Sequence, residues 1–357
     1  MTGKSVFSRL HQIPQWTLIL AGSATLFGLC ELANLPASAL IGPMLVGVLA
    51  GSNGATARIP NRLFQFAQAI LGVLIASSIE LEILQVLVED WHLFMGGVLA
   101  TVAASSFLGW QISRWNILPG TTAIWGSAPG AATAMVLMAG AFGADYRLVA
   151  FMQYLRVMIV ALAAAGIAAF LLPKGEVSPL GQSFFVVVDA SSLAATFAVA
   201  LGGASVGYLV RLPSPSFLGA MILGALLHLG FGVSFQLPPW LLTLAYALIG
   251  WSIGLNFTAE IVRHARRALP QVMGSILLLI LFCAGIAFLL SRLLGIDFLT
   301  AYLATSPGGM DAIAIIAAST TSVNMSFVLA MQMARFLFVL IAGPAIARAI
   351  AGRTRAK

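Results

Sequence analysis

Long apolar runs, separated by short polar stretches, follow one another along almost the whole chain. A helix needs about 20 predominantly apolar residues to cross the hydrocarbon core of a bilayer, and most of these runs are close to that length. The pattern therefore predicts an all-α polytopic membrane protein. The runs of the first half lie near residues 16–33, 37–52, 63–79, 92–112, 121–142 and 148–172, and those of the second half near 184–208, 215–231, 241–256, 270–291, 299–318 and 325–347.

The composition agrees with this prediction. Of the 357 residues, 60% are hydrophobic and only 8% are charged, whereas an ordinary soluble domain has about 25% charged residues. The longest polar stretches, such as residues 173–183, are too short for a separate soluble domain. The net charge of +7 is scattered between the apolar runs, which is typical of membrane orientation and of contact with anionic lipid. We therefore expect membrane lipid as a partner and no nucleic acid.

The two halves of the chain have similar sequences. The segment TAIWGSAPGAATAM (residues 122–135) matches TAYLATSPGGMDAI (residues 300–313), 178 residues later. LPASALIGPMLVGVL matches LPSPSFLGAMILGAL, and QYLRV matches QMARF, at nearly the same offset. Because the offset is about half the chain length, the sequence predicts two membrane-embedded repeats, residues 1–178 and 179–357.

Positive charge indicates how the repeats are oriented. Six crossings in each half would give both halves the same orientation, and five would turn the second half upside down. Cytoplasmic loops of membrane proteins are enriched in Lys and Arg, and five crossings place most basic residues on one side. These residues are Lys4, Arg9, Arg58, Arg62, Arg114, Arg147, Arg211, Arg263, Arg266, Arg267, Arg348, Arg353, Arg355 and Lys357, with Lys174 and Arg292 on the other side.

The expected fold is therefore two inverted repeats with about 10 spans, plus two broken or re-entrant segments that contain Pro-Gly. A broken helix that crosses, combined with a different short segment that does not, would also give an odd number of crossings in each half. The choice of crossing segments therefore stays open. In this arrangement both termini are cytoplasmic. The loops at 80–91 and 173–183 lie outside the bacterial inner membrane.

Pro-Gly sequences interrupt apolar runs at matching positions of the two halves, in residues 126–132 (GSAPGAA) and 305–311 (TSPGGMD). Proline removes a backbone hydrogen bond and glycine lets the chain leave helical geometry. The freed polar groups are tolerated only against protein or a water-filled cavity. A single kink is common in membrane helices, but paired interruptions are typical of a transporter's substrate site. The predicted substrate-binding residues here are Ser127, Pro129, Gly130, Thr305, Ser306, Pro307, Gly308 and Gly309.

A deeply placed arginine follows each interruption: Arg156 in the first half and Arg335 in the second, each with a glutamine three residues earlier on the same helix face. Burying an arginine in a membrane is costly, so each arginine needs a partner. One interpretation is that both bind a substrate anion. The other is that each caps the carbonyl groups of its neighbouring broken helix, or pairs with Asp311 or Asp189.

Asp311 has no acidic counterpart, because the matching position in the first half is Thr133. Such an asymmetry is a place for coupling chemistry, since a carboxylate shielded from water can bind a proton. Asp311 is therefore predicted to be the coupling residue. It could equally be a permanent counter-ion of Arg335.

Other functional motifs are absent from the sequence. The four histidines, His11, His92, His228 and His264, are far apart and form no metal-binding pattern. The two cysteines lie in apolar runs and are typical of core residues. There is no phosphate-binding loop and no nucleophile elbow. We therefore expect no metal, no cofactor and no enzymatic activity.

The duplicated LP-S--(I/L)G-M and PG blocks resemble the bacterial AbrB family of membrane proteins, in particular the Gram-negative type with an AbrB duplication. The resemblance covers nearly the whole chain. The family is similar to the cation/proton antiporter and anion transporter group, which implies inverted repeats and interrupted helices. Members are labelled AbrB-type regulators or ammonia monooxygenases. Four scattered histidines do not supply the copper ligands of a monooxygenase, and the polar stretches are too short for a DNA-binding module.

The expected function is secondary transport of a small anionic solute, coupled to H⁺ or Na⁺. The alternative is a membrane regulator that does not transport and that affects gene expression indirectly. By similarity to related transporters, the segments starting at 16, 37, 184 and 215 resemble a scaffold. We expect a homodimer through these segments.

Overall fold

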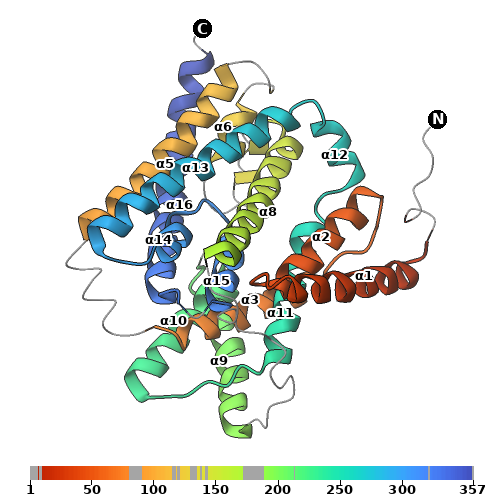
Figure 1. Ribbon diagram of the computed structural model, residues 1–357, viewed down its shortest axis with the longest axis vertical. Coiled ribbons are helices and arrows are strands. Elements are labelled where there is room, and N and C mark those ends of the chain that lie inside the picture. Colours follow the sequence, from red (N-terminus) through yellow and green to blue (C-terminus); the bar gives the residue numbers. More distant parts are fainter. Residues whose placement is uncertain are drawn as a thin grey trace. The chain divides into compact units, whose positions relative to one another are not determined.

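The computed structural model of the protein describes residues 7, 10–79, 91–114, 118, 121–128, 135–136, 139–140, 144–171, 189–212, 214–320 and 322–355. The described residues form 14 helices (Figure 1). They are α1 (Gln12–Leu32), α2 (Ser38–Ser52), α3 (Asn61–Ala76), α5 (Trp91–Arg114), α6 (Thr122–Ser127), α8 (Tyr146–Leu171), α9 (Ala190–Leu209), α10 (Pro215–Phe231), α11 (Pro239–Gly254), α12 (Ala259–Ala265), α13 (Leu269–Leu294), α14 (Phe298–Thr305), α15 (Met310–Ala318) and α16 (Met325–Arg355).

Helix length and composition confirm the prediction of a helical membrane-type protein. Among the described residues, α1, α5, α8, α9 and α13 are each long and apolar enough to cross a membrane, and α11 with α12 counted together would make a sixth. The helices α2, α3 and α10 are apolar but shorter. The number of about 10 spans, the inverted orientation and the sidedness of the termini stay predictions. Residues 80–90 of the predicted loop at 80–91, the loop at 173–183, and Pro129 and Gly130 lie outside the described residues.

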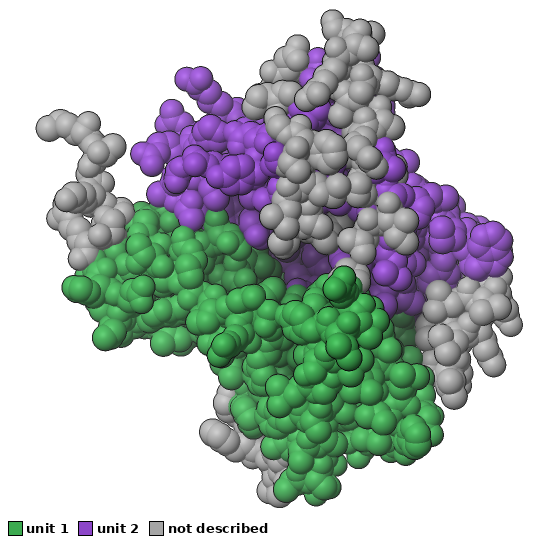
Figure 2. Space-filling view, turned by 180° about the vertical axis from the view of Figure 1, so that it is seen from behind, with its two compact units in different colours: residues 1–88, 165–256, 314–326 green, residues 89–164, 257–313, 327–357 purple. Residues whose placement is uncertain are grey.

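The chain divides into two compact units, each containing segments from both halves of the sequence (Figure 2). Unit 1 comprises residues 1–88, 165–256 and 314–326, and unit 2 comprises residues 89–164, 257–313 and 327–357. These units differ from the predicted repeats, 1–178 and 179–357. Each unit is therefore built from equivalent pieces of the two halves.

In unit 1, helices of one half pack on helices of the other at glycine crossings. A Cβ atom on Gly72 of α3 would lie 2.5 Å from the carbonyl oxygen of Phe217 on α10. A Cβ atom on Gly250 of α11 would lie at the same distance from the carbonyl oxygen of Leu40 on α2. Only glycine lets the backbones approach so closely. The two crossings involve matching positions of the halves, with the partners exchanged.

The entries to α2 and α10 share an unusual backbone. Ala37 and Ser214, the N-caps of these two helices, have φ of 57° and 56°, and Asn34 and Arg211, three residues earlier, have φ of 53° and 60°. Positive φ is uncommon for residues other than glycine. Its occurrence at four matching positions shows that the two halves fold alike here.

Unit 2 holds the interrupted segments. The short helix α6 packs against α5, the short helix α14 packs against α13, and α5 and α13 pack against each other. Phe94 on α5 lies against Phe327 on α16, with ring centroids 4.8 Å apart. The outer side of α13 exposes Leu277, Leu281 and Phe288, as expected for a face toward lipid. The short helices are therefore held from one side by a long apolar helix each.

Candidate functional site

The first interruption is the end of α6, where Gln153 of α8 fixes the last turn. The Nε2 atom of Gln153 donates to the carbonyl oxygens of Trp125 and Ala128, both at 3.0 Å. Arg156, one turn later on α8, donates through Nη1 to the carbonyl oxygens of Ser127 and Ala128, at 3.3 and 3.0 Å. Nη2 of Arg156 donates to Oε1 of Gln153 at 2.8 Å.

The second interruption lies between α14 and α15 and is held by α16 in the same manner. Nε2 of Gln332 donates to the carbonyl oxygens of Leu303 and Ser306, at 2.7 and 3.1 Å. Arg335 donates to the carbonyl oxygens of Ser306 and Gly308 and to Oε1 of Gln332. Every acceptor except that of Gly308 matches an acceptor in the first half.

These contacts follow from the chemistry of helix ends. The last carbonyl groups of a helix have no partner within the helix, and in an apolar protein they cannot bind bulk water. A cation at the C-terminal end also interacts favourably with the helix dipole. Arg156 and Arg335 are 3% and 6% exposed, so their charges are buried at these helix ends. The structure therefore shows the carbonyl-capping role that the sequence left as one of two interpretations.

Asp189, one of the partners considered for the arginines, has another role. Its side chain caps α9 in unit 1 by accepting from the backbone N–H of Ser192, at 2.9 Å, and from the hydroxyl of Ser191. The hydrogen bonds from Ser191 and Ser192 lower the pKa of Asp189 to about 2. Asp311 lies in the first turn of α15, directly after the second interruption.

The predicted hydroxyl groups bond to their own helices. Ser127 donates to the carbonyl oxygen of Ala123 at 2.8 Å, and Thr305 donates to that of Ala301 at 2.9 Å. Ser306, which has no exposed surface, donates to the carbonyl oxygen of Leu303. These hydroxyl oxygens keep lone pairs for accepting a further hydrogen bond. They are therefore poor donors to an anion in this structure.

Gly308 and Gly309 let the second interruption approach α8. A Cβ atom on Gly308 would lie 3.1 Å from Cγ1 of Val160, and one on Gly309 would lie 3.2 Å from Cγ1 of Val157. Val157 directly follows Arg156, so the second interruption reaches the arginine-bearing helix of the first half. Arg335 donates to the carbonyl oxygen of Gly308, so this arginine holds the segment that lies against the helix of Arg156. Unit 2 thus brings both arginines together.

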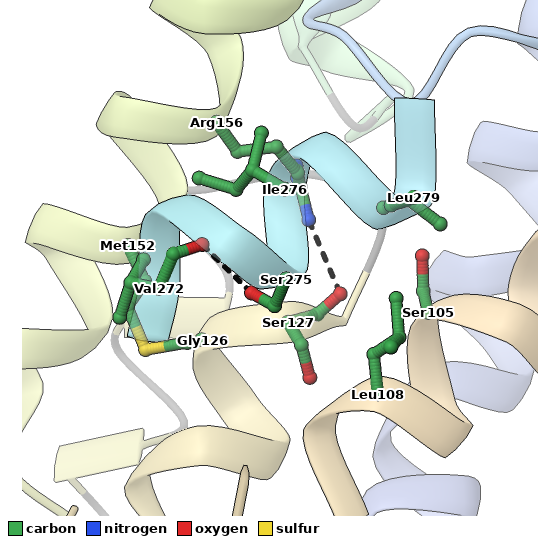
Figure 3. A pocket seen from close by; sticks show the side chains of 10 residues that line it. All are labelled: Ser105, Leu108, Gly126, Ser127, Met152, Arg156, Val272, Ser275, Ile276 and Leu279. Carbon is green, nitrogen blue, oxygen red and sulfur yellow. Dashed lines mark hydrogen bonds between the residues drawn. The ribbon is translucent and has the colours of Figure 1, made fainter. Parts of the chain in front are cut away.

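A small cavity of about 20 Å³ lies beside Arg156 (Figure 3). It has room for about one water molecule. Nε of Arg156 and Oγ of Ser105 are buried without a hydrogen-bond partner, and both residues line the cavity. Figure 3 shows Arg156 directed toward the backbone of Ser127, with α13 passing beside it. The lining residues are Ser105, Leu108, Gly126, Ser127, Met152, Arg156, Val272, Ser275, Ile276 and Leu279.

Ser105 and Ser275 were not predicted as site residues. Both are single hydroxyl residues inside long apolar runs, which is common in membrane helices and carries little information by itself. Among the described residues, no group of three or more His, Cys, Asp or Glu side chains could hold a metal ion. The candidate site therefore offers arginines, hydroxyls and carbonyl groups.

Similar proteins are known for nearly the whole chain. Residues 7–351 match the model of the family described as Transition state regulatory protein AbrB. The chain is 43% identical over 336 residues to the Escherichia coli (strain K12) protein named "Putative regulator AbrB", an alignment that covers 94% of this chain and 96% of that protein. It is 26% identical over 305 residues to "Uncharacterized protein YhjN" of Bacillus subtilis (strain 168), covering 79% and 77% of the two chains. The matched region includes both interruptions and both arginines.

Proposed function

Since the chain belongs to the AbrB family, we propose that it is a secondary transporter for a small organic anion in the bacterial inner membrane, coupled to H⁺ or Na⁺. The main support is the pair of buried arginines, each held at the end of an interrupted helix by equivalent hydrogen bonds. Paired interruptions of this kind mark the substrate sites of many transporters.

The electrostatics of the pair favour an anion over a neutral or cationic solute. A buried guanidinium group is costly in an apolar protein, and carbonyl dipoles compensate only part of its charge. Nε of Arg156 and Nε of Arg335 are both buried without a hydrogen-bond partner. An anion near both groups would gain two charge-assisted hydrogen bonds and would relieve the repulsion between them.

In this proposal the site comprises the predicted residues of both interruptions, with Asp311 as the coupling residue. Asp311 lies in the first turn of α15, where the helix N-terminus favours negative charge. Binding of H⁺ or Na⁺ at Asp311 would cancel its charge and so favour the anion beside it. This gives a physical reason for the two ions to travel together.

The size of the cavity sets a further condition. Its volume of about 20 Å³ is enough for one water molecule but not for an organic anion. Transport therefore requires a second conformation in which α13 and the end of α6 lie further apart. Movement of one helix group against another is the usual basis of alternating access.

The function can be tested with the purified full-length protein in proteoliposomes. Uptake and counterflow of labelled carboxylates and amino acids would be measured with an H⁺ gradient, with a Na⁺ gradient and without either. We expect saturable transport that depends on one gradient. Inactivity of a folded protein over the whole panel would contradict the proposal.

Two variants connect such transport to the site. Arg156→Lys keeps the charge but removes the planar group of donors, and it should reduce transport on the order of tenfold or more. Arg58→Lys is the matched control, because Arg58 also donates to carbonyl groups, those of Ala55 and Ala57, but lies in unit 1. Equal effects of both changes would argue against a site at Arg156.

A membrane regulator without transport is the second candidate function. The description of the family as a regulatory protein and the name of the Escherichia coli relative favour it. In that case an effect on gene expression would pass through a partner protein. A variant that folds but does not transport would still restore regulation in a deletion strain, whereas a transporter-based effect would be lost.

We also propose a homodimer. The four segments expected to form a scaffold correspond to α1, α2, α9 and α10, which all belong to unit 1. Within this group, α1 exposes Leu18 and Leu29, and α9 exposes Leu201 and Val206. A mass measurement in lipid nanodiscs checks this proposal, and a monomer would contradict it.

A further inference from the structure

A second, much larger cavity lies in unit 2, away from the arginine pair. Its volume is about 640 Å³, and it lies between the first turn of α8 and the segment of α12 with the turn that follows it. Every side chain that lines it is ionisable. The lining residues are Arg147, Glu260, Arg263, His264, Arg266 and Arg267. We call this cavity the arginine basin.

Two ion pairs hold the wall of the basin. Nη1 of Arg147 lies 2.6 Å from Oε1 of Glu260, and Nε2 of His264 lies 2.8 Å from Oδ2 of Asp145. These pairs join the beginning of α8 to α12. The two segments are far apart in the sequence, since 113 residues separate Arg147 from Glu260. The basin is therefore a tertiary arrangement and not a local run of basic residues.

The charge of the basin is strongly positive. The four arginines face two carboxylates, those of Glu260 and Asp145, so the arginines alone leave a surplus of two positive charges. Arg263, Arg266 and Arg267 are exposed. Neither of the two pairs described above involves them. The positive charges of these arginines repel one another, and an anion bound between them would relieve the repulsion.

The chemistry of the lining indicates a phosphoryl group. The volume of this open hollow is large enough to admit a phosphoryl group. The guanidinium fork binds phosphate through two parallel hydrogen bonds, so a cluster of arginines favours phosphate over a halide. No aromatic or aliphatic side chain lines the basin, so a ligand would be recognised by its negative charge and not by a ring or an acyl chain.

We infer that the arginine basin is a binding site for a phosphoryl group with two or more negative charges or for several such groups close together. The group could belong to a soluble phosphorylated compound or to the headgroup of an anionic phospholipid. The binding does not depend on the proposed transport activity, and the two can be tested separately.

The place of the basin in the fold gives this binding a route to the arginine pair. Arg263, Arg266 and Arg267 precede α13, whose residues Val272 and Ile276 line the small cavity beside Arg156. On the other side, Arg147 lies at the start of α8, which carries Arg156 itself. A ligand that draws α12 and α8 together would therefore act on two helices that line the small cavity.

The first experiment uses the full chain in nanodiscs of phosphatidylcholine with pyrophosphate as the soluble probe. Binding would be measured by calorimetry at near-physiological salt, with sodium chloride and sodium acetate as control anions. We expect saturable binding of pyrophosphate and an increase in melting temperature that chloride and acetate do not produce. Absence of saturable binding here and in the lipid experiment below would overturn the inference.

Two triple variants give a matched comparison. Replacement of Arg263, Arg266 and Arg267 by Gln should weaken binding on the order of tenfold or more. The control replaces Arg62, Arg114 and Arg211, which are exposed and outside the basin, by Gln and changes the net charge equally. The affinity of this control for pyrophosphate should change less than about threefold. Only long-range electrostatic attraction is lost, and salt screens it. Equal losses in both triple variants would show that binding is unspecific and would overturn the inference.

The variant Glu260→Gln supplies a test with the opposite sign. It removes a negative charge from the basin and frees Arg147, so pyrophosphate should bind more tightly, by about threefold or more. A variant that merely damaged the structure would not strengthen binding. An unchanged or weaker affinity of this folded variant would count against the basin as the site.

The lipid experiment distinguishes the two sources of the phosphoryl group. Nanodiscs containing phosphatidylglycerol would be compared with those of phosphatidylcholine alone. If the headgroup occupies the basin, phosphatidylglycerol should raise the melting temperature of the parent protein and weaken pyrophosphate binding, but should not do so in the Arg263, Arg266 and Arg267 variant. If pyrophosphate binds equally well in both lipids, the site takes a soluble ligand.

Discussion

Gln153 accepts a hydrogen bond from Arg156 through Oε1, at 2.8 Å, while its own amide group donates to the end of α6. The glutamine thus orients the guanidinium group and also caps the helix that the arginine caps. Gln332 and Arg335 repeat the arrangement at the end of α14. Because both partners are buried, each pair forms a rigid polar bracket for an interrupted helix.

The first prediction concerns the bracket at Arg335. Arg335→Ala would leave the carbonyl group of Gly308 without its donor and that of Ser306 with only the amide of Gln332. A buried polar group that loses its donor costs about 1–3 kcal/mol. We expect a clear decrease in the melting temperature in detergent. Arg335→Lys, which retains a charge and a donor, should lose less stability.

The same variant tests the counter-ion interpretation of Arg335. If its main role were to neutralise Asp311, the double change Arg335→Ala with Asp311→Asn would recover the stability of the parent. Capping of the carbonyl groups predicts no such recovery. Full recovery in the double variant would therefore contradict the capping role.

The second prediction uses two glycines of α5. A Cβ atom on Gly109 would lie within 3.0 Å of Cβ of Ser127 and would also collide with its hydroxyl, whereas Gly96 has nothing within 4 Å of that position. Gly109→Ala should displace the end of α6 and reduce transport on the order of tenfold or more. Gly96→Ala should have no such effect. Equal transport by the two folded variants would mean that the position of Ser127 is not critical.

The third prediction concerns pH. Partial burial would raise the pKa of Asp145, but hydrogen bonds from His264 and from the backbone N–H groups of Leu148 and Arg147 outweigh it and hold this pKa below its ordinary value of 3.8. Because this pKa is lower in the folded state, the ionised carboxylate of Asp145 stabilises the fold above the unfolded-state pKa. This stabilisation is lost as the pH falls through the folded-state pKa.

The variant Asp145→Asn checks this contribution. At pH 5 to 6 the variant should melt at a lower temperature than the parent, and the difference should shrink once the pH falls below about 4. Melting curves at several pH values supply the measurement. A difference that stays constant down to pH 3 would show that the ionised carboxylate is not the source of the stability.

The fourth prediction concerns topology. Reporter fusions after Glu89, after Gln182 and at the C-terminus would give the side of the membrane for each position. The inverted-repeat proposal predicts that the first two lie outside and the third in the cytoplasm. A cytoplasmic signal at Gln182 would mean that the first half crosses the membrane an even number of times. The inverted arrangement would then be wrong.

Much of the fold and part of the site could be predicted from the sequence, because the duplication supplies internal comparison. It placed the glutamine and arginine of each half together, and the 3.6-residue period put them on one helix face. It could not show whether the arginines face an anion or a carbonyl group, since both interpretations require the same residue at the same depth. The structure shows the guanidinium groups bonded to carbonyl groups, and binding of an anion stays a proposal.

The arginine basin was also beyond reach of the sequence. Arg147 and Glu260 are 113 residues apart, and they belong to different halves without being matching positions. In the sequence these arginines only indicated membrane orientation, which requires no particular arrangement of side chains. Ser105 was missed for a similar reason, since a single serine in an apolar helix has no pattern around it.

The glycine crossings of unit 1 have a consequence for how such a protein can arise. Gly72 of the first half lies against Phe217 of the second, and Gly250 of the second lies against Leu40 of the first, so neither half contains both sides of these two crossings. A half-length ancestor could have buried these surfaces only by pairing with another copy of itself. Joining two copies in one chain makes this pairing permanent and lets the two copies differ, as they do where Asp311 matches Thr133.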